Sequence, residues 1–413
     1  MNKPFQRILT ELSIGISLDI IFFLLILVEL LSLTHWQSIY GLTVCRWTFI
    51  SSACLQVCFL IYIKPSENDF KSNRTIGLIL WFVACLWVVP ELQQIYINNP
   101  LDYKQADMLP VIDIMCDRWL HFKDPYLVIP EIWKGVQPIY LPALWMPFIL
   151  SKVFQFDPRW ITIGMLLLSL LILSLQRMHP HRSIFLYAFI FIWFDFVLHV
   201  RKEVFIYSEE GVVYAYYILL IISVIYRKLA WIGILMACIL MSRYVIVFLL
   251  IAFLLNLLLS KRTDPFIKIV RPMVQTSLGM LLISGAWKHI HLFFSLPNQY
   301  LSQMKTALWK YQNLWKDSIG LAGWLTRDQI RTMHYVLEGS LIVIGIVMIL
   351  MRKKINQRIF FSFLKLTAVL FYFLLILPYP YLMNTSIWIS IAIYAGWPMM
   401  NESPHSDTLF YSL

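Results

Sequence analysis

Long apolar runs separated by short polar stretches make up most of the chain. Three of them, at about 18–33, 41–63 and 75–97, occupy most of the N-terminal quarter. Their apolar positions are continuous, whereas the strands of a membrane barrel alternate apolar and polar positions. A helix needs ~20 apolar residues to cross a bilayer, and it satisfies its own backbone hydrogen bonds there. The pattern therefore predicts transmembrane helices.

Further apolar runs continue the pattern to the end of the chain, at 139–156, 160–175, 183–200, 211–226, 229–259, 272–287, 335–351, 359–377 and 381–397. Together they predict an all-α, polytopic transmembrane helical bundle with about 11 to 13 spans. No polar segment is long enough to fold as a soluble domain. We therefore expect residues 1–413 to form a single integral-membrane domain, with amphipathic surface helices in two outer loops.

The run at 229–259 is interrupted by Ser242-Arg243-Tyr244. Its 31 residues are too few for two full spans, so two half-length helices that meet at Arg243 beside a cavity are predicted. An arginine buried in lipid without a partner is costly, which makes Arg243 a functional candidate. The alternative is that its side chain reaches the membrane surface.

Composition supports a membrane protein, since 60% of the residues are hydrophobic, 14% are charged and the mean hydropathy is +0.70. Soluble domains carry about a quarter charged residues. The net charge of +11 is typical of basic cytoplasmic loops. We predict no nucleic-acid binding, because no basic helix or aromatic platform is present.

Basic residues also predict the orientation of the chain. Lys64, Lys71 and Arg74 place their loop inside, so the N-terminus is expected in the cytoplasm and the next polar segment outside. Arg177 and Arg182 conflict with this count, and either a re-entrant run or an exception to the rule would explain them. No small-residue cleavage site follows the first run, which favours an uncleaved first span.

The next polar segment, residues 98–138, is an outer acidic loop. It holds six of the 23 acidic residues of the chain: Asp102, Asp107, Asp113, Asp117, Asp124 and Glu131. Leu109, Ile112, Met115 and Cys116 recur at helical spacing, which predicts a juxtamembrane amphipathic helix over about 104–122. Asp107 begins this helix and is expected to face the bundle, although its effect on the helix dipole alone would also explain it. We expect Asp102, Asp113 and Asp117 to be solvated.

Two proline patterns follow the acidic helix. Asp124-Pro125-Tyr126 is a turn signal. Tyr140-Leu141-Pro142, with Pro147 further on, predicts a kinked or broken helix at the head of the next run.

A second outer loop is predicted at 288–334, where Lys288 and His289 begin a polar stretch. An amphipathic helix at the membrane interface is expected around Trp315, since apolar residues recur there at helical spacing. His289 and His291 are two residues apart, which does not favour a metal site on a helix. His179 and His181 are expected in a loop.

The chain resembles the GT-C superfamily of membrane glycosyltransferases in the order of four features. These are an acidic residue, a surface helix, a Pro-Tyr turn and a Tyr-x-Pro sequence that opens the next span. Among the bacterial members of this superfamily, the chain resembles especially the mannosyltransferases that depend on polyprenyl-phosphate-mannose. Asp107, Asp124-Pro125-Tyr126 and Tyr140-Leu141-Pro142 carry the resemblance, and Glu209-Glu210-Gly211 and Arg243 extend it to about residues 101–262. The chain departs from the family in its three runs before the acidic loop, its Phe122-Lys123 without glycine, its Glu-Glu pair and its arginine in place of lysine.

The resemblance implies transfer of a sugar from a polyprenyl-phosphate donor to an acceptor hydroxyl on a lipid or glycan, at the outer surface of a bacterial inner (plasma) membrane. Asp107 would be the general base, with Asp102 in reserve. The expected substrate-binding residues are Arg243, Tyr126, Tyr140, Glu209, Glu210, Lys288 and His289. Membrane lipids are the remaining partners. No cofactor is required, although the carboxylate oxygens of Asp107 and Asp102 could hold a divalent cation.

Two other functions remain open. A transporter or lipid-linked sugar flippase would use Arg46, Asp195 and Arg243 as a buried charge path. Glu29 and Asp195 lie in apolar runs and are expected to be buried polar groups. Arg46 is expected either to pair with one of them or to reach the membrane surface. An oligosaccharide polymerase or ligase would depend more on the loop at 288–334.

Overall fold

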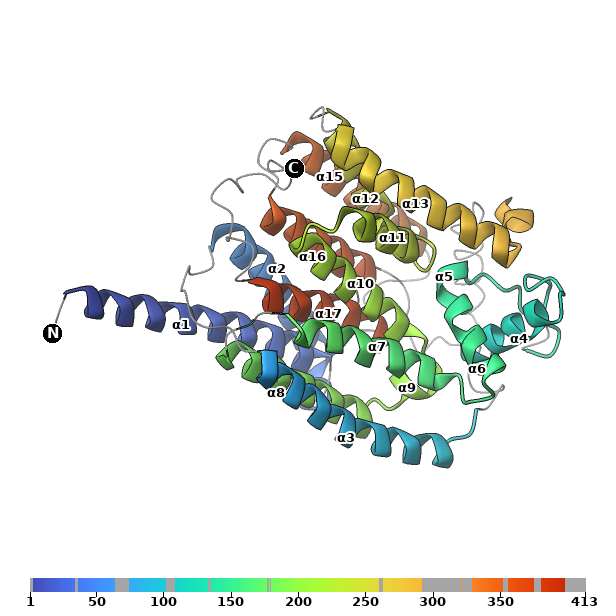
Figure 1. The fold of residues 1–413 in the computed structure, drawn as a ribbon, viewed down its shortest axis with the longest axis horizontal. Coiled ribbons are helices and arrows are strands. Elements are labelled where there is room, and N and C mark those ends of the chain that lie inside the picture. Colours follow the sequence, from blue (N-terminus) through green and yellow to red (C-terminus); the bar gives the residue numbers. More distant parts are fainter. Residues whose placement is uncertain are drawn as a thin grey trace.

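The computed structural model describes residues 3–33, 36–63, 74–101, 108–132, 135–176, 178, 180–259, 263–291, 320, 329–351, 356–374 and 380–397. Figure 1 shows these residues as a bundle of helices, from which the N-terminal helix extends to the left. Apart from helices, turns and loops, the described residues contain only an isolated antiparallel bridge between Ile129 and Val136. The prediction of an all-α fold is confirmed.

The first three predicted runs are helices. They are α1 (Lys3–Ser32), α2 (Trp36–Tyr62) and α3 (Arg74–Asn98). α1 and α2 pack against each other, and Gly41 kinks α2 with a φ of 79°, a value that glycine adopts without steric cost.

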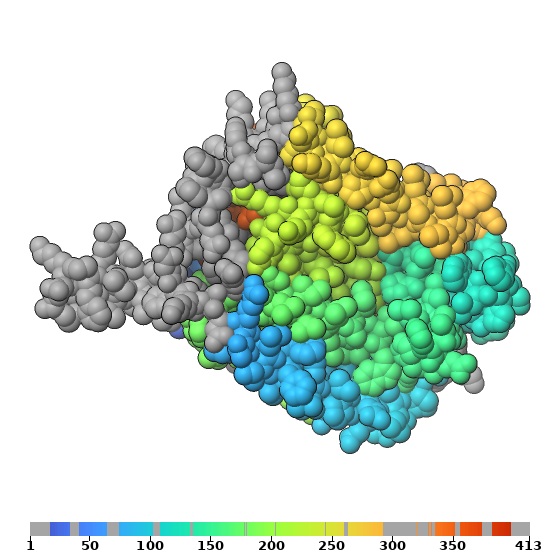
Figure 2. Space-filling view, viewed as in Figure 1, coloured from blue at the N-terminus to red at the C-terminus, as the bar shows by residue number. Residues whose placement is uncertain are grey.

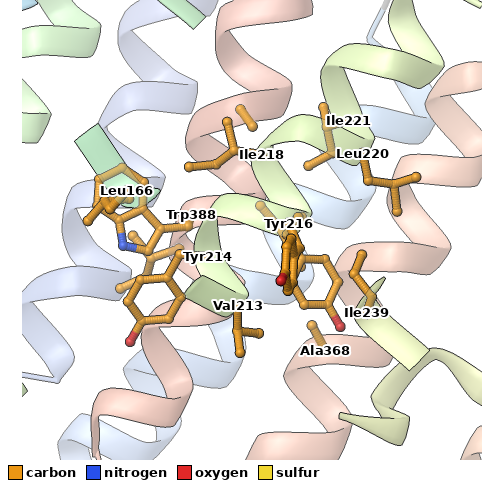
Figure 3. Close-up of a cluster of buried hydrophobic side chains, with 14 of the residues drawn as sticks. Leu166, Val213, Tyr214, Tyr216, Ile218, Leu220, Ile221, Ile239, Ala368 and Trp388 are labelled. Atoms are coloured by element: carbon orange, nitrogen blue, oxygen red, sulfur yellow. The ribbon is translucent and has the colours of Figure 1, made fainter. Parts of the chain in front are cut away.

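The centre of the bundle is α10 (Glu210–Ile225), which is buried on almost every side. α7 (Arg159–Ser174) and α17 (Pro380–Gly396) pack against it. In Figure 3, Trp388 of α17 lies beside Tyr214 of α10, and the two rings stack with centroids 6.2 Å apart. Apolar residues all round a helix are typical of a buried position.

The interrupted run forms α11 (Leu229–Leu240), a 3-10 turn η2 (Tyr244–Ile246) and α12 (Val247–Leu259). This confirms the prediction of two half-length helices that meet at Arg243. α13 (Thr263–Ser284) packs closely along α11. A Cβ atom added to Gly233 would lie 2.1 Å from the carbonyl oxygen of Ile269, so this contact requires glycine.

The predicted break after Tyr140 is also present. The segment divides into α5 (Pro142–Trp145), η1 (Met146–Phe148) and α6 (Ile149–Val153). The remaining elements are α4 (Met108–Leu120), α8 (Pro180–His199), α9 (Glu203–Tyr207), η3 (Ala286–His289), α15 (Ile330–Leu350) and α16 (Gln357–Leu374).

Within the described residues, four helices are long and apolar enough to cross a membrane: Gly41–Tyr62, Arg74–Asn98, Pro180–His199 and Thr263–Ser284. Six shorter apolar helices accompany them. α10, for example, has 16 residues, which at ~1.5 Å per residue is shorter than the hydrocarbon core. The bundle has membrane-spanning character, and the span number of about 11 to 13 stays a prediction.

A charged pair is buried between α1 and α16. The Lys365 amine lies 2.8 Å from both carboxylate oxygens of Glu29, and both side chains are 0% exposed. Burial of Glu29 is therefore confirmed. The expectation for Asp195 is wrong, because its side chain is 68% exposed and pairs with His199 near the end of α8. Asp195 therefore does not belong to a buried charge path with Arg46 and Arg243, although Arg46 itself is buried.

A second buried cluster ties α8 to α1. Arg182 Nε donates to Asp19 Oδ2 at 2.7 Å, and His181 Nε2 lies 2.9 Å from the same oxygen. The expectation of a loop is wrong for His181, which lies in the first turn of α8. Arg182 also lies in α8 rather than in a loop, and Asp19 balances its charge. His179 and Arg177 lie outside the described residues.

Candidate functional site

The surface helix of the acidic loop is α4, and its apolar face is the one that the sequence predicts. Leu109, Ile112, Met115 and Cys116 are all buried. The helix begins at Met108, and the expected start at 104–107 lies outside the described residues. Asp107 and Asp102, the predicted base and its reserve, lie there too, so their roles stay predictions.

The polar side chains of α4 differ in their surroundings. Asp113 accepts a hydrogen bond from the Lys152 amine at 2.7 Å and is only 11% exposed. The expectation that Asp113 is solvated is wrong, because α6 covers that side of α4. Asp117 is exposed as expected. Burial raises the pKa of the Cys116 thiol, which keeps it neutral and unreactive.

The short helix α5 connects the acidic loop to the Arg243 break. The Ala143 amide donates to the carbonyl of Met241 at 3.0 Å. The Tyr216 hydroxyl of α10 donates to the Ala143 carbonyl at 2.9 Å. On the other side, Trp145 Nε1 donates to the Tyr126 hydroxyl at 3.1 Å. The Tyr-x-Pro opening and the arginine, which are distant in sequence, are therefore brought together.

Arg243 forms an ion-pair cluster with the two glutamates at the start of α10. Its Nη2 donates to Glu209 Oε1 at 2.6 Å and to Glu210 Oε1, and its Nε lies 3.2 Å from Glu210 Oε1. Both carboxylates are 0% exposed, whereas the arginine side chain is 26% exposed. These bonds use Nε and Nη2, so among the described residues Nη1 is the nitrogen left for a ligand. The helix N-terminus adds partial positive charge beside the carboxylates.

Tyrosines surround this cluster. Tyr140, which is half-buried, and Tyr372 of α16 both interact electrostatically with Arg243. Tyr214 and Tyr217 of α10 do the same with Glu210. Four predicted site residues, Tyr140, Glu209, Glu210 and Arg243, are thus gathered here. Tyr217 and Tyr372 were not predicted as site residues. The seven-residue spacing from Glu210 to Tyr217, which places both on one helix face, is a signal that would have found the first of them.

A second cluster joins the acidic loop to the end of α13. His289 Nε2 lies 2.6 Å from Asp124 Oδ2, and the Tyr126 amide donates to Asp124 Oδ1 at 2.9 Å. The rings of Tyr126 and His289 have centroids 5.5 Å apart. Burial raises the pKa of the Tyr126 phenol, so it remains a hydrogen-bond donor. In Figure 2 the cyan surface around α4 meets the orange end of α13.

Tyr126 and His289 therefore belong to one site, and α5 lies between it and Arg243. The pairing of His289 with Asp124 was missed, since 165 residues separate them. Lys288 is exposed, with its amine 5.8 Å from the centroid of the Trp287 ring. The amphipathic helix expected around Trp315 lies outside the described residues.

Comparison of the chain with protein-family models, curated proteins and solved structures finds no match. The chemistry of the site must therefore be argued from its own residues. Within the described ranges, no three His, Cys, Asp or Glu side chains gather to hold a metal ion. What these residues offer is an oriented guanidinium beside two carboxylates, at a place where a polar loop enters an apolar bundle.

Proposed function

We propose that this chain is a multi-pass membrane glycosyltransferase. It moves a sugar from a polyprenyl-phosphate donor to an acceptor hydroxyl on a lipid or glycan at the outer membrane–water interface. The supporting observation is the partly exposed guanidinium of Arg243, which two buried carboxylates hold in one orientation. Arginine keeps its charge when it is partly buried, and its guanidinium forms strong charge-assisted hydrogen bonds to phosphate oxygens.

In this proposal Arg243 uses Nη1 to bind the donor phosphate. The acceptor hydroxyl loses its proton to the Asp107 carboxylate, and its oxygen attacks the anomeric carbon of the sugar. The bond between that carbon and the phosphate oxygen breaks, and the phosphate keeps the electron pair. The leaving group is already an anion, so it needs a cation rather than a proton. Arg243 supplies that charge, and Tyr140 lies beside it.

The two glutamates act as positioning residues for Arg243. A guanidinium held at Nε and Nη2 has little rotational freedom left, so less entropy is lost when phosphate binds. Asp102 remains the reserve base, and with Asp107 it would supply oxygen ligands if a divalent cation takes part. Tyr126, Lys288 and His289 are assigned to the acceptor side, where the acidic loop meets the end of α13.

The proposed location is a bacterial inner membrane, with the N-terminus in the cytoplasm and the acidic loop outside. Its support is the positive-inside distribution of Lys64, Lys71 and Arg74. Within the part of the chain that the structure describes, four helices of sufficient length and apolarity agree with a membrane setting.

Arg243 provides the experiment. Arg243→Lys keeps the positive charge but loses the planar guanidinium that reaches the two glutamates and the phosphate at the same time, and we expect donor KM to rise about ten-fold while the protein remains folded. Arg243→Ala leaves two buried carboxylates without their cation, so its loss of stability must be measured beside its activity. Transfer from a radiolabelled short-chain polyprenyl-phosphate mannose is followed in purified membranes. Unchanged donor saturation in Arg243→Lys contradicts the phosphate role.

A further inference from the structure

Two buried polar atoms lie beside the Arg243 cluster on one face of α10. Glu210 and Tyr217 are two helical turns apart, so their side chains share that face. Both residues are fully buried. Glu210 Oε2 and the Tyr217 hydroxyl have no hydrogen-bond partner within the described part of the chain. The Tyr217 phenol also interacts electrostatically with Tyr372, Glu210 and Arg243, so it lies beside the same cluster.

Buried polar groups in native proteins are almost always hydrogen-bonded, and an exception calls for an explanation. A carboxylate oxygen only accepts, whereas a phenol donates or accepts. Hydroxyl groups on a sugar ring match this pair, because one of them donates to the carboxylate while a neighbour bonds the phenol. A phosphate oxygen does not match, since it has no proton to give to Glu210 and carries the same charge.

A metal ion is also a poor match for these atoms. Oε1 of each glutamate already accepts from the Arg243 guanidinium, and within the described residues no third His, Cys, Asp or Glu side chain joins them to complete a metal site. A neutral ligand rich in hydroxyl groups needs no such ligand set and supplies the donor that Glu210 Oε2 lacks. Arg243 is the partly exposed member of the cluster, so a ligand with phosphate at the arginine would extend its sugar toward Glu210 and Tyr217.

We infer that Glu210 and Tyr217 form a subsite for the hydroxyl groups of the transferred sugar, next to the phosphate position at Arg243. This inference rests on the proposed function. Glu210 then has two roles, since Oε1 positions the arginine and Oε2 accepts from the sugar. Tyr217 has only the second role, which makes it the cleaner residue to test.

Tyr217→Phe removes one hydroxyl and no ring. The matched control is Tyr394→Phe, because Tyr394 is also buried with an unpartnered hydroxyl but interacts with Asp19 and Arg182 instead of Glu210. Binding to the full-length protein in nanodiscs is measured with two probes. One is short-chain polyprenyl-phosphate mannose, and the other is the same polyprenyl phosphate without sugar.

The inference predicts that Tyr217→Phe weakens binding of the mannose probe about ten-fold, the effect of one lost hydrogen bond. It predicts a change below about two-fold for the sugar-free probe, and no change with either probe in Tyr394→Phe. A monodeoxy-mannose probe that lacks the contacted hydroxyl should bind the wild type and Tyr217→Phe equally.

Equal weakening of both probes, or no weakening of either, overturns the sugar subsite. If the wild type still transfers sugar in that case, the proposed function stands without it. If the wild type binds neither probe and transfers nothing, the proposed function is wrong and the subsite is wrong with it.

Discussion

The buried pair of Lys365 and Glu29 leads to a stability prediction for Lys365→Met. The Lys365 amine donates three hydrogen bonds of 2.8 Å, two to the carboxylate of Glu29 and one to the Ser386 carbonyl. The carboxylate also accepts from Gln56 Nε2 at 2.6 Å. All of these side chains are fully buried. The lysine is therefore the single cation that balances a buried anion within this network.

Removal of one member of a buried ion pair typically costs about 3–5 kcal/mol, because the other charge is left in a medium of low dielectric. We expect this loss of unfolding free energy in Lys365→Met. The double variant Glu29→Leu with Lys365→Met removes both charges. Gln56 keeps its bond to the Leu25 carbonyl, so the double variant should lie within about 1–2 kcal/mol of the wild type.

Unfolding is followed by tryptophan fluorescence in mixed detergent micelles for the wild type, both single variants and the double variant. The coupling energy between the two positions is the quantity of interest. A double variant as unstable as the singles would refute the charge-balance argument. A stable double variant that has lost activity would show instead that the pair takes part in function, as a transport path requires.

Further predictions concern helix packing and the hold on α4. Gly233→Ala should destabilise the bundle by about 1–3 kcal/mol, since the new Cβ atom overlaps the Ile269 carbonyl. Gly164→Ala is the control, because a Cβ atom added to Gly164 would meet open space. It should be neutral or slightly stabilising when the thermal unfolding of both variants is compared. Lys152→Met should lower the free energy of unfolding by only about 1 kcal/mol, because its ion pair with Asp113 is partly exposed. Loss of that pair should also speed amide hydrogen exchange in α4. Unchanged exchange would show that apolar packing alone holds α4.

Local patterns were sufficient to predict the helices around the candidate site. The interruption at Arg243 gave two half-length helices, and Pro142 and Pro147 gave a broken helix, because both signals act through the backbone of their own segment. The apolar spacing of α4 predicted its buried face for the same reason.

Partners distant in sequence were not predictable in this way. Lys365 follows Glu29 by 336 residues, and no periodicity within either helix indicates that they meet. Asp113 has the spacing of a solvated residue on α4, yet α6 brings Lys152 to it. Asp195 lies in an apolar run, but it is exposed near the end of α8. Such differences arise from tertiary packing, which a single sequence encodes only indirectly.

The central claim is that the acidic loop supplies the base for sugar transfer beside Arg243. Asp107→Asn tests it most directly, with Asp117→Asn as the control, because Asp117 belongs to the same loop and is exposed. Transfer of labelled mannose from its polyprenyl phosphate is measured with equal amounts of each purified protein. We predict that Asp107→Asn loses at least about a hundred-fold in kcat, as expected for a lost general base, while Asp117→Asn keeps wild-type activity. Full activity in Asp107→Asn would contradict the account.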